Sequence, residues 1–249
     1  MAPLALVWSA GSLFLATVLV RGSVPYEELL LDPTTGPGRF WYTGLVSNVG
    51  ILGWSAAAVT AAWGAWVAGL GDRPLARQAL RGGALLSMLL LGDDLFQFHV
   101  VVSNALGQGK ALFYALYLVL TGAWLVDNRN ELRRTRWPLL AAALGALGTS
   151  VAIDQISIAG AWRLAAEDSA KFLGILAWAL YFATTARDLT RSVFNAAGRP
   201  STVQPPRADE PLGNGLSHPQ HRDDNVPVAL ANMNERGPFP APPLESPAR

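Results

Sequence analysis

Cysteine is absent from the 249-residue sequence, and charged residues make up only 15% of it. The first absence excludes disulfide bonds, thiolate catalysis and zinc or iron-sulfur centres held by cysteine. The second is unusual, because soluble domains are about 25% charged. The net charge of +1 gives no reason to expect a nucleic-acid partner.

Apolar residues, in contrast, make up 51% of the sequence and gather in long runs. Runs of about 17 to 25 mainly apolar residues are typical of helices that cross a membrane. We therefore predict an all-α membrane protein, with a bundle of six transmembrane helices in residues 1–186. The predicted spans are about 3–20, 43–70, 83–103, 111–126, 137–153 and 167–186.

The composition changes at Arg187. Residues 187–249 hold 11 of the 17 prolines, and their seven arginines are balanced by seven acidic residues. A segment with so few large apolar side chains cannot bury a core. We predict a disordered, Pro-rich cytoplasmic tail, which is also a candidate segment for binding a cytoplasmic protein.

Arginine is concentrated in alternate connections between the predicted spans. The connections after 43–70 and after 111–126, and the segment after 167–186, hold at least three basic residues each, whereas the others hold about one or two. Positively charged connections stay on the cytoplasmic side of a membrane. We predict a multi-pass protein of the cell membrane, embedded in the lipid bilayer, with both termini in the cytoplasm.

The most unusual stretch is residues 92–99, GDDLFQFH, within the apolar run 83–103. Its two acids, Asp93 and Asp94, lie roughly ten residues, ~15 Å along a helix, from either end of that run. An ionisable group near the middle of a membrane costs several kcal/mol unless it is paired, neutralised or hydrated. A structural ion pair needs one carboxylate, so the second acid must be protonated or bound to something else.

Lys171 is the predicted partner of these acids. It lies one helical turn from Glu167 and Asp168, and its long stem can instead reach inward toward the helix that holds Asp94. Such a pair can be functional, or it can be a structural tie between two helices. Around an uninterrupted helix His99 lies about 120–140° from either acid. We therefore do not expect Asp94 and His99 to form a simple chelating pair, and an ordinary hydrogen-bonded histidine is an open alternative.

Further polar residues are predicted on the outer side of the same helices. Gln97 shares a helix face with the acids, Asp154 ends one span, and Glu167 and Asp168 begin the last. Acidic residues are also favourable at any helix N-terminus, which is the simpler interpretation of that last pair. The candidates for binding a proton or cation are Asp93, Asp94, Gln97, His99, Asp154, Glu167, Asp168 and Lys171.

Small residues recur in the span 137–153. Ala141, Gly145 and Thr149 are spaced four residues apart, so they share one face of the helix. Small side chains let two helices approach closely in a membrane. We predict that this face packs against a neighbouring helix.

Two motifs resemble those of a known group of proteins. The patterns D-D-x-F-x-x-H at 93–99 and E-D-x-x-K-F-x-G at 167–174 are similar to motifs of uncharacterised bacterial multi-pass membrane proteins. The resemblance covers the third to sixth predicted helices and implies a bacterial inner membrane, but it implies no activity. A glutamate often follows the histidine in that group, whereas Val100 stands here.

Three functions fit these features. The favoured one is a carrier whose carboxylates bind a proton or cation from outside, with Lys171 as the internal counter-charge. The second is an intramembrane enzyme for a lipid-linked substrate, in which Asp93 and Asp94 hold a metal or share a proton and His99 acts as acid or base. The third is a non-catalytic anchor or scaffold that presents the tail. The sequence specifies no substrate, cofactor or metal, and it leaves a homo-oligomer open.

Overall fold

The structure is a computed structural model that describes residues 2–20, 44–106, 111–155 and 161–197. All regular elements within these ranges are helices, and the helices belong to one compact unit. Their bounds are α1 Ala2–Val20, α3 Leu45–Leu70, α4 Pro74–Phe96, α5 Phe98–Leu106, α6 Ala111–Asp127, α7 Arg129–Leu132, α8 Trp137–Gln155 and α9 Ala161–Ala197. The predicted disorder beyond residue 197 lies outside the described residues.

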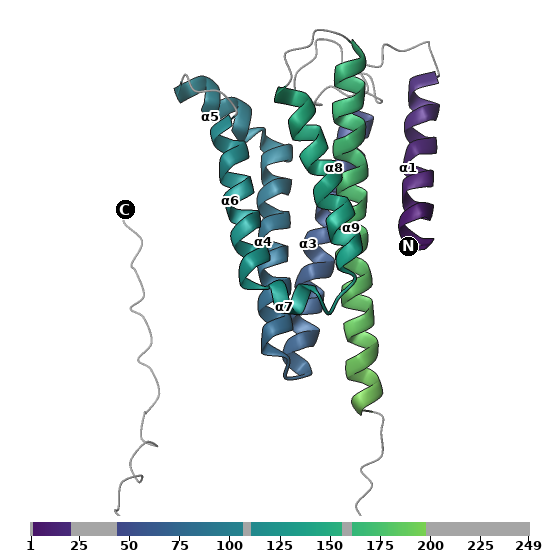
Figure 1. Ribbon diagram of the computed structural model, residues 1–249, viewed down its shortest axis with the longest axis vertical. Helices are drawn as coiled ribbons and strands as arrows, with labels where there is room; N and C mark the ends of the chain where they lie inside the picture. The colour runs from purple at the N-terminus through teal and green to yellow at the C-terminus, as the bar shows by residue number, and fades with distance from the viewer. Residues whose placement is uncertain (1, 21–43, 107–110, 156–160, 198–249) are drawn as a thin grey trace, which may run out of the picture. The chain divides into compact units, whose positions relative to one another are not determined.

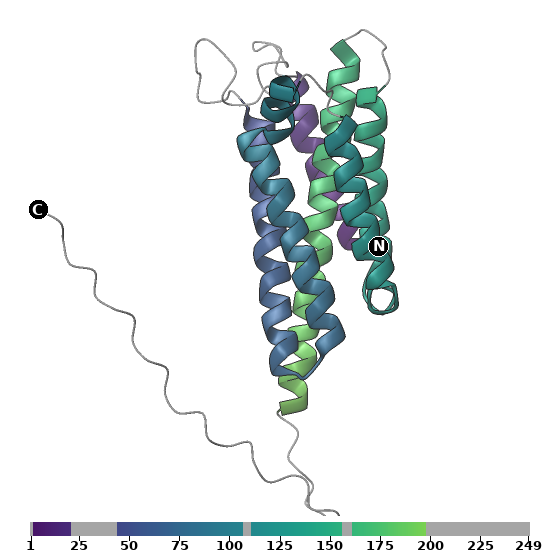
Figure 2. The same ribbon diagram turned by 90° about the vertical axis from the view of Figure 1, so that its left-hand side faces the viewer.

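Successive long helices run in alternating directions, as Figure 1 shows. The C-terminal ends of α4 and α8 and the N-terminal ends of α6 and α9 form what we call the site end. The start of α4, the end of α6, α7 and the C-terminal end of α9 form the opposite, or arginine, end. The extensively packed pairs are α9 with α8, α9 with α3, and α3 with α4, so α9 runs between α3 and α8 (Figure 2).

Three helices are long and apolar enough to cross a membrane: α3, α8 and all but the two terminal residues of α9. Helices α1 and α6 are also apolar, but their apolar stretches are shorter than those of the three candidate spans. Over the described residues, the predicted all-helical fold is confirmed, and the three helices are consistent with the predicted membrane protein by their length and composition.

Aromatic side chains fill the centre of the core. The ring of Trp178 on α9 lies 6.1 Å from that of Trp54 on α3 and 5.8 Å from that of Trp124 on α6. Gly83 on α4 makes room for this cluster, because a β-carbon there would lie 2.4 Å from the ring of Phe182. A side chain at that position would have to displace a fully buried ring, so the backbone of α4 at Gly83 lies directly against the Phe182 ring of α9.

Helix α4 differs from the continuous helix predicted over 83–103. It begins at Pro74 and ends at Phe96, and Gln97 takes a left-handed conformation with φ 53°. The early start is missed by hydropathy because Arg77 and Arg81 interrupt the apolar pattern, although Leu80 between them is buried. The break places the two acids in the last turn of α4 rather than at the middle of a longer helix.

Helix α9 extends well beyond the predicted span 167–186, from residue 161 to residue 197. Residues 187–197 were predicted to be disordered, and this is wrong. Leu189 is buried, and Val193 packs against Gly71 at the turn before α4. The apolar stripe of α9 thus continues among charged residues, which a search for long apolar runs does not detect.

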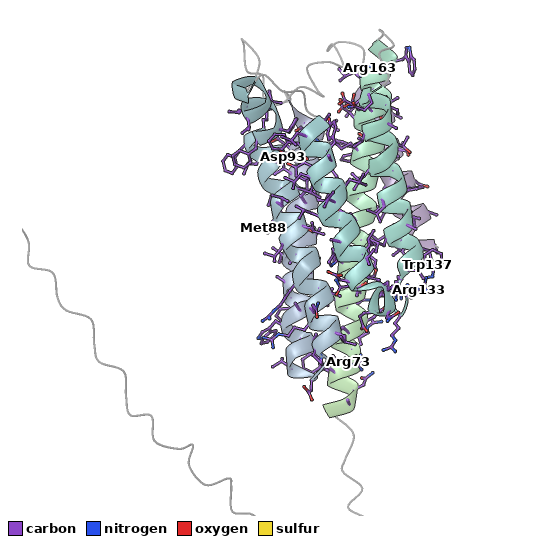
Figure 3. The ribbon with its side chains drawn as sticks, turned by 60° about the vertical axis from the view of Figure 1, so that its left-hand side comes forward. Arg73, Met88, Asp93, Arg133, Trp137 and Arg163 are labelled. Atoms are coloured by element: carbon purple, nitrogen blue, oxygen red, sulfur yellow. The ribbon has the colours of Figure 1, made fainter. Side chains whose placement is uncertain are left out.

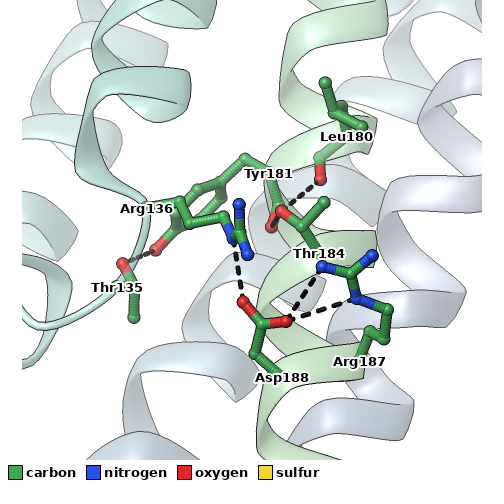
Figure 4. A network of polar contacts seen from close by, with 7 residues as sticks. All are labelled: Thr135, Arg136, Leu180, Tyr181, Thr184, Arg187 and Asp188. Atoms are coloured by element: carbon green, nitrogen blue, oxygen red, sulfur yellow. Dashed lines mark hydrogen bonds and ion pairs between the residues drawn. The ribbon is translucent and has the colours of Figure 1, made fainter. Parts of the chain in front are cut away.

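Polar contacts also fix this lower part of α9 (Figure 4). The Arg136 guanidinium donates to Asp188 at 2.8 Å, and Arg187 lies 3.0 Å from the other oxygen of the same carboxylate. The Thr135 and Tyr181 hydroxyls are 3.0 Å apart. These contacts attach the connection before α8 to α9.

The predicted packing face of α8 is wrong. Ala141, Gly145 and Thr149 are exposed, and a β-carbon at Gly145 would meet no atom within 4 Å. Helix α8 instead buries Ala143 and places Leu147 against Gly174 of α9. The small residue at the close approach is therefore supplied by α9, because a glycine there leaves space for the larger leucine of α8.

Candidate functional site

A cavity of about 720 Å³ opens at the site end. Figure 3 shows Asp93 and Arg163 toward this end and Arg73 and Arg133 toward the other. The cavity walls come from α3, α4, α5, α6, α8 and α9. All eight residues predicted as binding candidates line it: Asp93, Asp94, Gln97, His99, Asp154, Glu167, Asp168 and Lys171.

Asp94 joins three helices. Its Oδ1 accepts a hydrogen bond from the Lys171 ammonium of α9 at 2.7 Å, and its Oδ2 accepts one from the Trp54 indole of α3 at 2.8 Å. Lys171 therefore extends inward to α4, as we predicted from the length of its side chain. The Asp94 side chain is 14% exposed and that of Lys171 is 42% exposed, so the pair borders the cavity and is not sealed in the core.

Asp93 pairs with His99. Its Oδ1 accepts a hydrogen bond from the His99 backbone N–H at 2.9 Å, and its Oδ2 lies 2.9 Å from His99 Nδ1. An ionised carboxylate can only accept, so Nδ1 carries the hydrogen in this contact. In a neutral ring, Nε2 is then the nitrogen that can accept a proton.

This contact corrects the angular separation predicted between His99 and the acids. That separation assumed one uninterrupted helix, whereas the chain turns at Gln97 before α5 begins at Phe98. The Gln97 backbone N–H donates to the Asp93 carbonyl at 2.7 Å, which closes the end of α4. The change of direction brings a histidine six residues further along back onto the side chain of Asp93.

A second polar group lies at the rim of the cavity. The Tyr114 hydroxyl of α6 donates to Asp154 of α8 at 2.8 Å. Arg163 at the start of α9 lies 3.8 Å from Asp154 and also 3.8 Å from Glu167. One guanidinium is thus shared by two carboxylates at long distance.

Sequence reasoning missed four residues of this site: Trp54, Tyr114, Tyr117 and Arg163. Trp54 lies next to the small residues Gly53 and Ser55–Ala58 of α3, and a tryptophan in a buried helix usually needs a hydrogen-bond acceptor for its indole N–H. Tyr114 and Tyr117 are three residues apart on α6, so they share a face, and both line the cavity.

The oxygens of Asp93 and Asp94 are occupied by protein groups. The Asp94 carboxylate contacts an ammonium and an indole, and the Asp93 carboxylate contacts a backbone amide and an imidazole. Within the described ranges, no three His, Asp or Glu residues are grouped as a metal site would require. The arrangement suits proton exchange between these groups better than it suits metal coordination.

A second cavity of about 690 Å³ lies at the arginine end. Its polar lining includes Arg73, Arg134, Arg136, Tyr181 and Asp188. None of the eight predicted residues lines it, and its main polar groups belong to the network that joins the start of α8 to α9.

A family model described as a domain of unknown function, DUF8692, matches residues 2–185, most of the chain. The chain belongs to this family. The DUF8692 match runs from α1 into α9 and includes every residue of the site described above. No curated protein and no solved structure matches the chain.

Proposed function

We propose that this DUF8692 protein is an integral protein of a bacterial cell membrane with six transmembrane helices and a cytoplasmic tail. Large apolar side chains on its outer surface support this, since Leu6, Leu13, Leu85 and Leu118 are each about 70% exposed or more. Such a surface is favourable against lipid and unfavourable in water. The resemblance to bacterial membrane proteins through the motifs at 93–99 and 167–174 is part of the same proposal.

The distribution of basic residues supports the orientation of the protein. Within the described ranges, the site end has Arg163 and Lys171, and the other basic residues belong to the arginine end. Under the positive-inside rule the arginine end is cytoplasmic and the cavity opens toward the outer side. The basic residues of the arginine end are Arg73, Arg77, Arg81, Arg129, Arg133, Arg134, Arg136, Arg187 and Arg191.

The site itself acts, in this proposal, as the proton-binding centre of a carrier. The observation that carries it is the partnering of two neighbouring carboxylates with two different basic side chains in one cavity. Asp93 is paired with His99 and Asp94 with Lys171. A proton that enters from the cavity binds at His99 Nε2, and the imidazolium is stabilised by Asp93. Lys171 compensates the charge of Asp94, which reduces the electrostatic repulsion between Asp94 and Asp93.

Proton flux into liposomes tests this proposal. Purified protein is reconstituted into vesicles that hold a trapped pH-sensitive dye, and a potassium gradient with valinomycin drives protons inward. Wild-type protein should acidify the lumen faster than protein-free vesicles do. His99→Gln and Asp93→Asn should each slow the flux at least tenfold, because each removes one member of the proton-binding pair.

Asp127→Asn is the matched control. Asp127 is exposed at the end of α6, so the substitution removes the same charge outside the cavity and should leave the flux unchanged. Flux equal to that of empty vesicles, or equal flux in wild type and His99→Gln, would overturn the proposal.

An intramembrane enzyme for a lipid-linked substrate is the second candidate. The Asp93–His99 pair favours it in one respect, since a histidine oriented by a carboxylate is a common general base. Hydrolysis of a lipid-linked probe that is lost in His99→Gln, without any proton flux in wild type, would support this candidate. The third candidate, a scaffold that uses the tail, depends on residues outside the described ranges.

A further inference from the structure

We propose that the cavity at the arginine end is the inner vestibule of the transport pathway, and that a stack of aromatic rings closes it off from the cavity at the site end. This inference rests on the proposed carrier function and orientation, and it assigns a role to the cavity of about 690 Å³. The stack, which we call the aromatic barrier, consists of Trp54 on α3, Trp124 on α6, and Trp178 and Phe182 on α9.

The two cavities approach each other closely but remain separate. Among the described residues, none lines both. Along α6, the site-end cavity extends to Thr121 and the other begins at Trp124, ~4.5 Å further along the helix axis. Along α9, the first ends at Ile175 and the second begins at Tyr181, ~9 Å further on. The layer between the cavities is therefore only about one to two helical turns thick.

The aromatic barrier fills this layer. The Trp178 ring lies 6.1 Å from that of Trp54, which lines the site-end cavity. It lies 5.8 Å from the ring of Trp124 and 5.3 Å from that of Phe182, which line the other cavity. Trp178 itself is 1% exposed and belongs to neither lining. A closely packed apolar layer of this kind excludes water, and a pathway without water does not conduct protons.

Helix α4 holds two of the rings in a fixed orientation. The Trp178 indole N–H donates to Ser87 Oγ at 2.9 Å, and the Trp124 indole N–H donates to the Ala79 carbonyl at 2.9 Å. Both acceptors belong to α4, and Ser87 is fully buried. Opening of the barrier at these rings thus requires the loss of buried hydrogen bonds, so the closed state is specifically stabilised.

The outer face of the barrier belongs to the proposed proton-binding site. The Trp54 indole N–H donates to Asp94 Oδ2 at 2.8 Å, while Lys171 contacts the other oxygen of that carboxylate. In this conformation the site is therefore reached from the site end only. A carrier releases its ligand on the second side after a change of conformation, and here that change must displace the aromatic barrier.

The inner face of the barrier leads to an open, polar space. Arg73, Leu75 and Arg134 border the arginine-end cavity and are exposed, so the described part of its mouth faces outward. Further in, the hydroxyls of Thr135 and Tyr181 lie 3.0 Å apart on its wall. A space with these borders is hydrated, and a proton that passes the barrier reaches water there.

The sidedness of cysteine labelling tests the two cavities, and the absence of cysteine from the chain removes any background. Thr121→Cys and Thr185→Cys each place one thiol on one lining. Right-side-out and inside-out membrane vesicles are treated with a membrane-impermeant methanethiosulfonate. Thr121→Cys should react at least tenfold faster from the outside, and Thr185→Cys at least tenfold faster from the cytoplasmic side. Absence of a reaction at Thr185→Cys, or equal reaction of Thr121→Cys from both sides, would overturn the inference.

Removal of a ring tests the barrier itself. In Trp178→Ala, Thr121→Cys should react at least tenfold faster from the cytoplasmic side than it does with the barrier intact. Ser87→Ala is the milder variant, because it keeps the ring and removes its acceptor, and it should accelerate this reaction at least about twofold. Trp66→Ala is the control, since it removes an exposed tryptophan that lies outside both linings. An unchanged rate in Trp178→Ala and Ser87→Ala would overturn the role of the ring stack.

These outcomes are separable from those of the proton-flux experiment, because labelling requires no transport. The expected sidedness without proton flux in wild type would retain the barrier and reject the proton carrier. Proton flux together with equal labelling of Thr121→Cys from both sides would do the reverse. Exchange of sides by both thiols would reject the orientation, and with it the assignment of the arginine-end cavity as the inner vestibule.

Discussion

Lys171 Nζ lies 2.7 Å from Asp94 Oδ1 and joins α9 to α4 across 77 positions of the sequence. Removal of either partner breaks this ion pair, and removal of Lys171 leaves the Asp94 carboxylate, which is only 14% exposed, without its ammonium donor. We expect Asp94→Asn and Lys171→Met each to lower the free energy of unfolding by about 1–2 kcal/mol. The double variant should lose less than the sum of the two. Denaturant unfolding in detergent micelles measures all three.

The control for this cycle is the pair Arg136 and Asp188 at the other end. Their side chains are 42% and 41% exposed, so removal of that pair should cost less than about 1 kcal/mol. If Asp94→Asn is as stable as wild type, the structural contribution of the Lys171 pair is refuted, and the charge is then kept for function alone.

The attachment of α5 depends on Asp93. Asp93→Ala removes both hydrogen bonds that the carboxylate makes with His99. Hydrogen exchange at the His99 amide should then accelerate at least about tenfold, since a hydrogen bond to a charged group contributes about 1.5–3 kcal/mol. Asp93→Asn keeps one acceptor oxygen and should accelerate exchange less. Unchanged exchange in Asp93→Ala would contradict the contact.

The turn at Gln97 carries backbone strain. Its φ of 53° is unfavourable for a residue with a β-carbon, and more so for a β-branched one. Gln97→Val should therefore lower the free energy of unfolding by about 1–2 kcal/mol, whereas Gln97→Gly should leave it unchanged or raise it. Asp72, with φ 52°, is the comparison, because Asp72→Gly relieves the same strain away from the cavity. A stabilising Gln97→Val would contradict this conformation.

Gly174 and Gly145 allow a closely packed glycine to be compared with one that faces open space. A β-carbon at Gly174 would lie 2.7 Å from Leu147 Cγ and 3.0 Å from its backbone nitrogen, so Gly174→Ala should lower stability by about 1–3 kcal/mol. Gly145 faces open space, and Gly145→Ala should raise stability by about 0.5–1 kcal/mol through helix propensity. The melting temperatures of both variants in detergent test this contrast, and a change of the same sign would refute it.

Much of the helical architecture could be predicted from apolar runs. The structure has helices over all six predicted spans, with close agreement for 3–20, 111–126 and 137–153. Agreement ends where charged residues continue a helix, at the start of α4 and at the end of α9. Hydropathy records only whether a segment is apolar. Leu80 and Leu189, which are buried among arginines, extend both helices through their periodicity.

It was easier to predict which residues belong to the site than which of them contact each other. Charged and polar residues in apolar helices are costly, so the positions of seven ionisable residues and Gln97 marked the eight candidates, and all of them line one cavity. The partner of His99 was not predictable by helical spacing, because one left-handed residue reorients everything that follows it. The roles of Trp54 and Tyr114 depend on contacts between helices 40 residues apart, which local pattern does not encode.

The charges of α4 run against the dipole of the helix. Its first turns carry Arg77 and Arg81 near the positive N-terminal end, and its last turn carries Asp93 and Asp94 near the negative C-terminal end. The end of the helix dipole thus raises the energy of both ionised acids. The Lys171 ammonium and the His99 N–H donors offset this unfavourable field as well as satisfying the two carboxylates. Because both acids lie in the same helical turn, we expect loss of the Lys171 charge to make ionisation of Asp93, as well as of Asp94, less favourable.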